Sequence, residues 1–326
     1  MLTPRENAMA IFEHRQPDCY NDMMASIKMV PDPMSLALIF PKDGKEYKDS
    51  WGTTYIFRQD QPAKYPHITK ENTVLKDIEN WKNEVVIPPA VGLDWSRAKA
   101  FEKTVDRDAY FVGVACPTGL FERTHYLMGF EEALMAFMEY PDEIAELLRA
   151  IADHKIAYIH EMAKHVHPDI IFFQDDWGSK QSVFLPPRVW RELIKPLQKE
   201  ISNAIHECGM IYMHHADCVC QPLVEDMVEI GVDVWQGVIP QNDILEIQRI
   251  TQGKLPMIGG IDGAALDRAE VTEEEIRAHV RMAIDKYCAA GRFYPSGRLF
   301  LKRNNDIVLD EVDKYGAEYA KTHPIV

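Results

Sequence analysis

Residues 169–178 read DIIFFQDDWG, a short apolar run that ends in two acids, a tryptophan and a glycine. Similar short runs, rich in Val, Ile, Phe or Tyr, occur at 109–115, 210–213, 232–235 and 255–258. Runs of this kind are typical of strands that are buried on both faces of a parallel sheet. The pattern therefore predicts a parallel β-sheet at the centre of the fold.

Long amphipathic stretches with helical periodicity separate these runs. They lie at 130–165, 186–208, 221–230, 243–252 and 272–290. Alternating strands and helices imply right-handed crossovers, and we expect them to close into a (β/α)8 TIM barrel. The missing strands should come from the N-terminal part and from around 291–301. No G-x-G-x-x-G follows a predicted strand, which argues against a dinucleotide-binding sheet.

The N-terminal part, about 1–100, is less regular and predicts an irregular extension plus the first barrel elements of a single domain, 1–326. Residues 3–15 predict a short amphipathic helix, with Thr3 as its N-cap and Pro4 at its first position. Residues 41–70 could form a hairpin or an extended arm around Trp51, and residues 73–83 look helical.

Composition excludes several classes of protein. The chain has 326 residues and a formal net charge of −15, which disfavours nucleic acids and anionic membranes as partners. No apolar run approaches the roughly 20 residues of a membrane span, and the N-terminus lacks a signal-peptide pattern. The six cysteines do not resemble a disulfide framework. We therefore expect a cytoplasmic protein.

Polar residues follow each predicted strand, and in a barrel such residues meet at one rim. Asp175 and Asp176 are adjacent, and neighbours on a strand face opposite ways, so we expect only one to face a cavity. The sequence does not say which one. The inward acid could orient substrate, bind a metal or act as a general base; the alternative is a helix N-cap or a solvated turn.

Residues 214–220, HHADCVC, concentrate side chains of the metal-ligand type. His215 and Asp217 are two residues apart, so they share one face of an extended segment and could hold Zn²⁺ with a third ligand. Glu122 could supply that ligand, and His125 lies three residues further along. The alternative is a buried, hydrogen-bonded histidine, cysteines that act as small apolar residues, and a Glu122 paired with an arginine.

Three stretches carry a family resemblance: 172–178, 186–196 and 215–233, the last reading HADCVCQPLVEDMVEIGVD. The first two are similar to a strand and helix of the uroporphyrinogen decarboxylase-like superfamily, and the third is similar to its H-S-C-G-N-V-x-P-L-I stretch. Residues 259–262 match its G-G-I-D turn, and residues 3–7 resemble its T-x-R-E-R start. The resemblance is collinear over nearly the whole chain and implies the barrel fold.

The resemblance also separates two activities. True decarboxylases of this family use an R-Q-A-G-R segment to hold a polycarboxylate, whereas residues 14–18 here read HRQPD. Residues 49–53 and 121–129 instead look like the corrinoid-linked methyltransferases that demethylate aromatic methyl ethers. Thiol-using relatives hold zinc with H-x-C and a distant Cys; here Asp217 replaces the first Cys, and the distant position falls near Ser296.

We therefore expect a methyltransferase that moves a methyl group from a small donor, such as an aromatic methyl ether, to a corrinoid on a partner protein. A decarboxylase-type carboxy-lyase, with Arg5, Arg15, Arg123 and Arg292 as candidate cations, and a non-catalytic corrinoid-binding subunit are the alternatives. A homodimer and a Zn²⁺ ion held by His215, Asp217 and Glu122 are left open. The expected catalytic residues are His215, Asp217, Asp176 and Glu122, and the expected substrate-binding residues are Trp51, Trp177, Cys116, His125, Gln236 and Asp262.

Overall fold

The computed structural model describes residues 1–61 and 63–325. The strands are β1 Ile27–Met29, β2 Glu46–Lys48, β3 Thr54–Ile56, β4 Tyr65–Pro66, β5 Phe111–Cys116, β6 Ile170–Gln174, β7 Ile211–His215, β8 Val234–Val238, β9 Met257–Gly260 and β10 Phe293–Ser296. The α-helices are α1 Pro4–Phe12, α2 Pro33–Ala37, α3 Trp81–Glu84, α4 Ser96–Glu102, α5 Leu120–Met128, α6 Phe130–Glu139, α7 Pro141–Val166, α8 Pro187–Leu193, α9 Lys195–Glu207, α10 Val224–Ile230, α11 Ile244–Thr251, α12 Gly263–Leu266, α13 Glu273–Tyr287 and α14 Lys302–Thr322. Short 3₁₀ helices are η1 Met23–Ser26, η2 Ile78–Asn80, η3 Gln221–Leu223 and η4 Cys288–Ala290.

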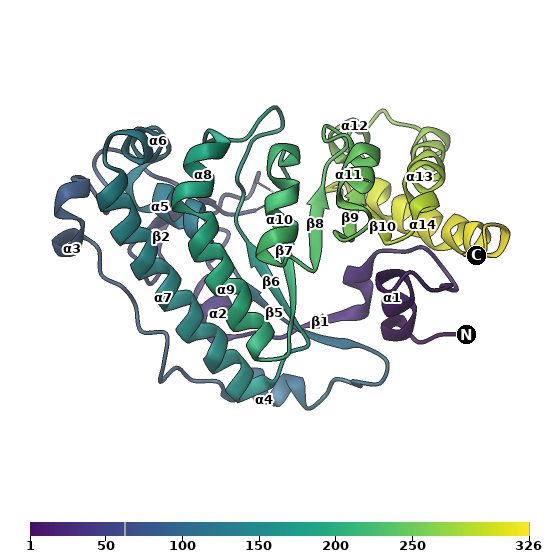
Figure 1. Ribbon diagram of the computed structural model, residues 1–326, viewed down its shortest axis with the longest axis horizontal. Helices are drawn as coiled ribbons and strands as arrows, with labels where there is room; N and C mark the ends of the chain where they lie inside the picture. The colour runs from purple at the N-terminus through teal and green to yellow at the C-terminus, as the bar shows by residue number, and fades with distance from the viewer. Residues whose placement is uncertain (62, 326) are drawn as a thin grey trace.

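Seven parallel strands form the main sheet, in the order β1-β5-β6-β7-β8-β9-β10. All five strands predicted from apolar runs are present, and helices connect each to the next (Figure 1). From β5 to β10, neighbours in the chain are neighbours in the sheet. The α/β class and the parallel sheet are therefore confirmed.

The closed (β/α)8 barrel is not confirmed. Within the described residues the sheet has seven strands, and its edge strands β1 and β10 do not pair with each other. Part of the N-terminal segment lies beside β10 instead: Tyr294 Oη donates to Ala8 O at 2.7 Å, and Ser296 Oγ donates to Asp22 Oδ2 at 2.6 Å. Among the described residues between β1 and β5, the strands β2, β3 and β4 pair with one another and do not join the main sheet.

The N-terminal extension contains the expected elements only in part. Helix α1 begins at Pro4 with Thr3 as its N-cap, and Thr3 and Glu6 form a capping box. The hairpin expected within 41–70 is a three-stranded antiparallel sheet, β2-β3-β4. The helix expected at 73–83 is wrong in its first half, since only η2 and α3, from Ile78 onward, are helical.

The two ends of the chain meet. Gln16 Nε2 donates to Ala320 O at 2.8 Å, and Ile325 N donates to Gln16 Oε1 at 2.8 Å. Figure 1 shows α1 and the end of α14 on the same side of the molecule. No helix of the described residues is long and apolar enough to cross a membrane.

Candidate active site

The carboxyl ends of three neighbouring strands carry a row of polar side chains. Gln174 of β6 is in register with His215 of β7, which is in register with Gln236 of β8. Residues in register on adjacent strands point to the same face, and all three are half-buried. His215 Nδ1 is hydrogen-bonded to Gln236 Oε1. Since an amide oxygen can only accept, Nδ1 carries the proton and Nε2 is left as an acceptor.

A β-bulge brings β8 close to His215. The register of β8 against β9 shifts between Gln236 and Val238, and Gly237 between them has a φ of 98°. A Cβ at this position would lie 3.1 Å from Ala216 O and 3.2 Å from His215 Nδ1. The glycine therefore allows both the left-handed backbone and the close approach that places the Gln236 amide on the imidazole.

His214 faces the opposite way and is fully buried. Its ring stacks on Trp177 with centroids 4.1 Å apart, and Tyr212 Oη lies 3.0 Å from its Nδ1. Burial lowers the pKa of His214 to about 3, so the imidazole is neutral at physiological pH. The alternative that one histidine of this pair is a buried, hydrogen-bonded residue is confirmed for His214.

Asp175 is the structural member of the acid pair. Its carboxylate accepts the amides of Leu120 at 3.0 Å and Glu122 at 2.9 Å, and the indole Nε1 of Trp177 at 2.9 Å. It therefore caps the N-terminus of α5 across the sheet. Gly119 makes room for this contact, because a Cβ there would lie 2.3 Å from Asp175 Cβ. Burial raises the pKa of Asp175 to about 6, although its N–H donors oppose the shift.

Asp176 lies on the same side as His215. Its Oδ1 accepts the amide of Asp217 at 3.0 Å. Burial raises the pKa of Asp176, the nearby charge of Asp217 adds to the shift, and His215 opposes it. The side chain of Asp217 does not join this group as expected: it is 55% exposed and pairs with Lys180 at 3.3 Å. Asp217 therefore contributes its backbone amide, which donates to Asp176, and its carboxylate lies outside this group.

Glu122 is the most strongly perturbed acid near this rim. Burial raises its pKa well above the usual value, and repulsion from Asp176 and Asp175 raises it further. Tyr126 Oη donates to Glu122 Oε1 at 3.4 Å. A raised pKa favours the protonated carboxyl, which is the form that can act as a hydrogen-bond or proton donor.

His125 sits one turn further along α5, in an aromatic cluster. Its ring centroid lies 5.2 Å from Phe121, 4.6 Å from Tyr126 and 5.4 Å from Phe130. Burial lowers the pKa of His125 to about 4. This histidine is therefore neutral at physiological pH, and its expected contact with substrate stays a prediction.

The two stretches that resemble the demethylating methyltransferases pack against each other. Arg123 donates to Asp49 Oδ2 at 2.7 Å in an ion pair that is almost completely buried, and its guanidinium lies 5.0 Å from the Trp51 ring. Thr53 Oγ1 also donates to Tyr126 O at 3.4 Å. Trp51 is 4% exposed and Trp177 2% exposed. Both tryptophans pack behind the rim, and their expected role as a wall for substrate stays a prediction.

A buried lysine near the end of β5 escaped the sequence reasoning. Lys155 is 2% exposed, and its Nζ donates to Pro117 O at 2.7 Å. Burial lowers the pKa of Lys155 and raises that of the nearby Cys116 thiol. The available signal was helical spacing, because Lys155 lies four residues after the buried Ile151 and four before the buried Ile159.

Asp262 occupies the expected turn after β9 and acts as a helix cap there. Its Oδ1 accepts Ala265 N at 3.2 Å, while its own amide donates to His279 Nε2 at 3.2 Å. Contact between Asp262 and substrate stays a prediction.

The expected zinc ligands do not form a metal centre. Among residues 1–61 and 63–325, no group of three His, Cys, Asp or Glu side chains is placed to hold a metal ion. The reason is local: the Asp217 carboxylate turns toward Lys180 instead of joining His215 and Glu122. We therefore derive no step through a metal held by these residues.

The arginines required by the carboxy-lyase alternative do not converge at this rim. Arg5 pairs with Asp169, before β6, and Arg15 pairs with Glu13. Arg123 is buried against Asp49, and Arg292 precedes β10. Within the described part of the chain, these four guanidinium groups do not form a cationic clamp beside His215.

A curved parallel α/β sheet with its polar residues at the carboxyl ends of the strands defines a barrel-like class of proteins. Residues 50–294 match the Uroporphyrinogen decarboxylase (URO-D) family, and the chain belongs to this family. The structure is similar to that of a methyltransferase from Methanosarcina mazei, with a TM-score of 0.62 and 12% sequence identity over 97% of this chain and 99% of that chain. At this identity the likeness shows the fold alone. No curated protein matches the sequence significantly. The resemblance inferred from sequence is confirmed.

Proposed function

We propose that the protein transfers a methyl group from a small O-methyl donor, such as an aromatic methyl ether, to the Co(I) corrinoid of a partner protein. The main support is the placement of Glu122, a half-buried acid whose pKa is raised, on the same rim as His215 and Asp176. Family membership and the fold shared with a methyltransferase agree with this proposal.

The chemistry requires a proton at the leaving oxygen. Co(I) attacks the methyl carbon with its electron pair and forms the Co–C bond, while the C–O bond breaks and its electrons go to oxygen. The donor leaves as an alcohol or phenol once that oxygen receives a proton, and cobalt ends as Co(III). A donor group aimed at the developing oxyanion lowers this barrier.

We assign Glu122 as the donor of that proton. Repulsion from Asp176 and Asp175 would favour the protonated form of Glu122 in the free protein, and the negative charge would pass from the leaving oxygen to Glu122 when the proton moves. His215, fixed by Gln236 with Nε2 as acceptor, would orient a hydroxyl or bound water of the donor. The corrinoid protein would approach the same rim.

The experiment uses free cob(I)alamin as acceptor and a panel of aryl methyl ethers as donors, with the absorbance change of Co(I) to methyl-Co(III) as the readout. We expect Glu122→Gln to lower kcat by about 10²–10⁴-fold and His215→Ala to abolish transfer with the fold intact. Glu131→Gln, an exposed acid on α6, is the matched control and should keep full activity.

The pH profile separates a proton donor from a structural acid. Because Glu122 acts in its protonated form, kcat should fall as pH rises through its raised pKa, and Glu122→Gln should lack that alkaline limb. Normal turnover in His215→Ala would contradict the assignment. Tight binding of a corrinoid protein without transfer from any ether would favour the non-catalytic alternative, and release of CO₂ from a carboxylated ring would favour a carboxy-lyase.

A further inference from the structure

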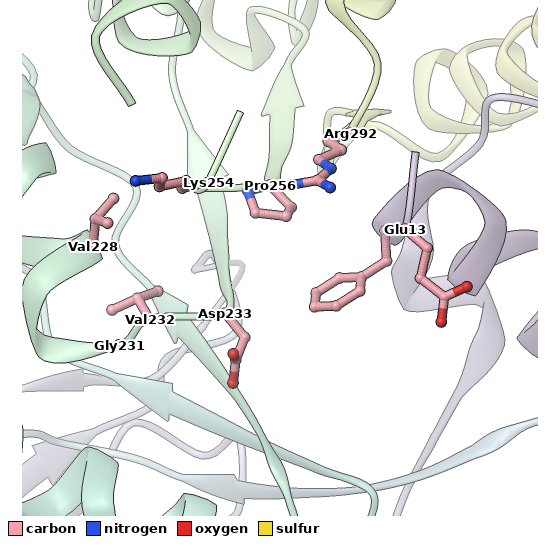
Figure 2. Close-up of a pocket in the computed structure, with 9 residues that line it drawn as sticks. Glu13, Val228, Gly231, Val232, Asp233, Lys254, Pro256 and Arg292 are labelled. Atoms are coloured by element: carbon pink, nitrogen blue, oxygen red, sulfur yellow. The ribbon is translucent and has the colours of Figure 1, made fainter. Parts of the chain in front are cut away.

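A cavity lies at the opposite end of the sheet from His215. Its volume is about 470 Å³, and it opens where the chain enters β8, β9 and β10 (Figure 2). Apolar side chains form much of its wall, namely those of Phe12, Val228, Val232 and Pro256. A smaller cavity of about 300 Å³ adjoins it and shares Arg292. Cavities of this size suit small organic molecules.

The two acids that line this cavity are already engaged. Glu13 pairs with Arg15 at 2.6 Å. Asp233 Oδ2 lies 2.8 Å from His206 Nε2 and accepts Tyr212 N at 2.7 Å. In Figure 2 the carboxylates of Glu13 and Asp233 point away from Pro256, which also lines the cavity. Neither acid is positioned to neutralise a cation inside it.

The two cations of the cavity have no carboxylate partner among the residues that the structure describes. Neither Lys254 nor Arg292 lies within 4.0 Å of a carboxylate oxygen, although the chain carries 51 acids against 36 Lys and Arg. Figure 2 shows the Arg292 guanidinium directed toward Pro256, with Lys254 extending along the other side of that residue toward Val228. Two unpaired cations beside an apolar wall in an acidic protein favour an anionic ligand.

The backbone holds Arg292 in an unfavourable conformation. Its φ is 54°, in the left-handed region that a non-glycine residue rarely adopts. Its Nη1 donates to Gly253 O at 2.9 Å, which fixes the guanidinium at the junction of the two cavities. The bond leaves Nη2 without a protein partner among the described residues. Strain of this kind persists where the surroundings select a particular side-chain position.

We propose that this cavity is a binding site for a small organic anion, a carboxylate or phosphate monoester that carries an apolar group. The anionic end would lie against the Arg292 guanidinium and the apolar group against Phe12 and Val232. Lys254, on the other side of Pro256, would add its positive charge to the site. Since Phe12 ends α1 and Arg292 leads into β10, the ligand would join the N-terminal helix to the edge of the sheet. The site is independent of methyl transfer.

The test measures thermal unfolding and calorimetric binding with benzoate, phenyl phosphate, acetate and inorganic phosphate. We expect benzoate or phenyl phosphate to raise Tm, and the stronger of the two identifies the anion class. Arg292→Gln and Lys254→Gln should each weaken binding by about tenfold or more. Arg97→Gln and Lys103→Gln remove the same charge at exposed positions of α4 and beyond it, and should not weaken binding.

His215→Ala separates this site from the candidate active site, because it should retain the full Tm shift with benzoate. Three results would overturn the proposal: no shift with either aromatic anion, an equal shift in Arg292→Gln and Arg97→Gln, or acetate and inorganic phosphate acting as strongly as their aromatic counterparts. Loss of the benzoate shift in His215→Ala would also overturn it, since the ligand would then occupy the other rim.

Discussion

Replacing the two adjacent acids one at a time gives opposite outcomes. Asp175→Ala removes the acceptor for the Leu120, Phe121 and Glu122 amides and for the Trp177 indole, all of them buried or half-buried. A buried donor left without a partner costs about 1–3 kcal/mol. Burial also disfavours the ionised form of Asp175, whose pKa is raised to about 6. Removing this carboxylate therefore offsets part of that cost. We expect a net loss of about 3 kcal/mol at pH 7.5.

Asp176→Ala is the matched control. The side chain of Asp176 accepts one amide, that of Asp217, and its burial likewise disfavours the ionised form. The variant should therefore change the free energy of unfolding by less than about 1 kcal/mol, while methyl transfer falls sharply.

Urea unfolding followed by both far-UV circular dichroism and tryptophan fluorescence measures these differences, and coincident curves establish a two-state transition. The assignment of Asp175 to the interior and Asp176 to the rim would be refuted by equal losses of stability in the two variants. It would also be refuted by a loss of under about 1 kcal/mol in Asp175→Ala.

Two further predictions concern buried charge. Asp49→Asn leaves Arg123 buried without its counter-charge and should lower the free energy of unfolding in urea by about 3–5 kcal/mol. The control Asp60→Asn removes an acid from a largely exposed ion pair with Arg58 and should leave stability unchanged within error. Equal effects of the two substitutions would contradict the burial of the Arg123–Asp49 pair. His214 has a pKa of about 3 when folded and 6.5 when unfolded, so stability is full above pH 6.5 and is lost as pH falls toward 3. The stability of His214→Phe relative to the unsubstituted protein should therefore rise by about 2 kcal/mol as pH is lowered from 7 to 5. A stability difference that does not change with pH would show that His214 can take up a proton in the interior.

Local pattern was enough to predict the sheet. Buried parallel strands need apolar side chains on both faces, and the run at 169–173 has them, as do the other four. The Thr3 cap of α1 and the turn at Asp262 also depend on neighbouring residues alone, and both occur where the sequence places them. The helix expected from residue 73 failed in its first half because packing, rather than propensity, decides such short segments.

Closure of the sheet could not be predicted, because it depends on what lies beside β1 and β10. The arrangement of the candidate site could not be predicted in full either. Alternation along a strand shows that Asp175 and Asp176 face opposite sides, but it does not show which side carries the helix that needs a cap. Lys155 was missed because its partner, Pro117, is distant in sequence.

The sequence by itself determined the family, the five central strands with the helical stretches between them, and the loops that follow those strands, because these follow from periodicity and from neighbouring residues. Only the tertiary structure decided that Asp175 caps α5, that the Asp217 carboxylate turns to Lys180, and that Glu122 is buried beside Asp176. Burial and charge at a side chain are set by atoms from many distant segments, and their energies decide which group keeps its proton.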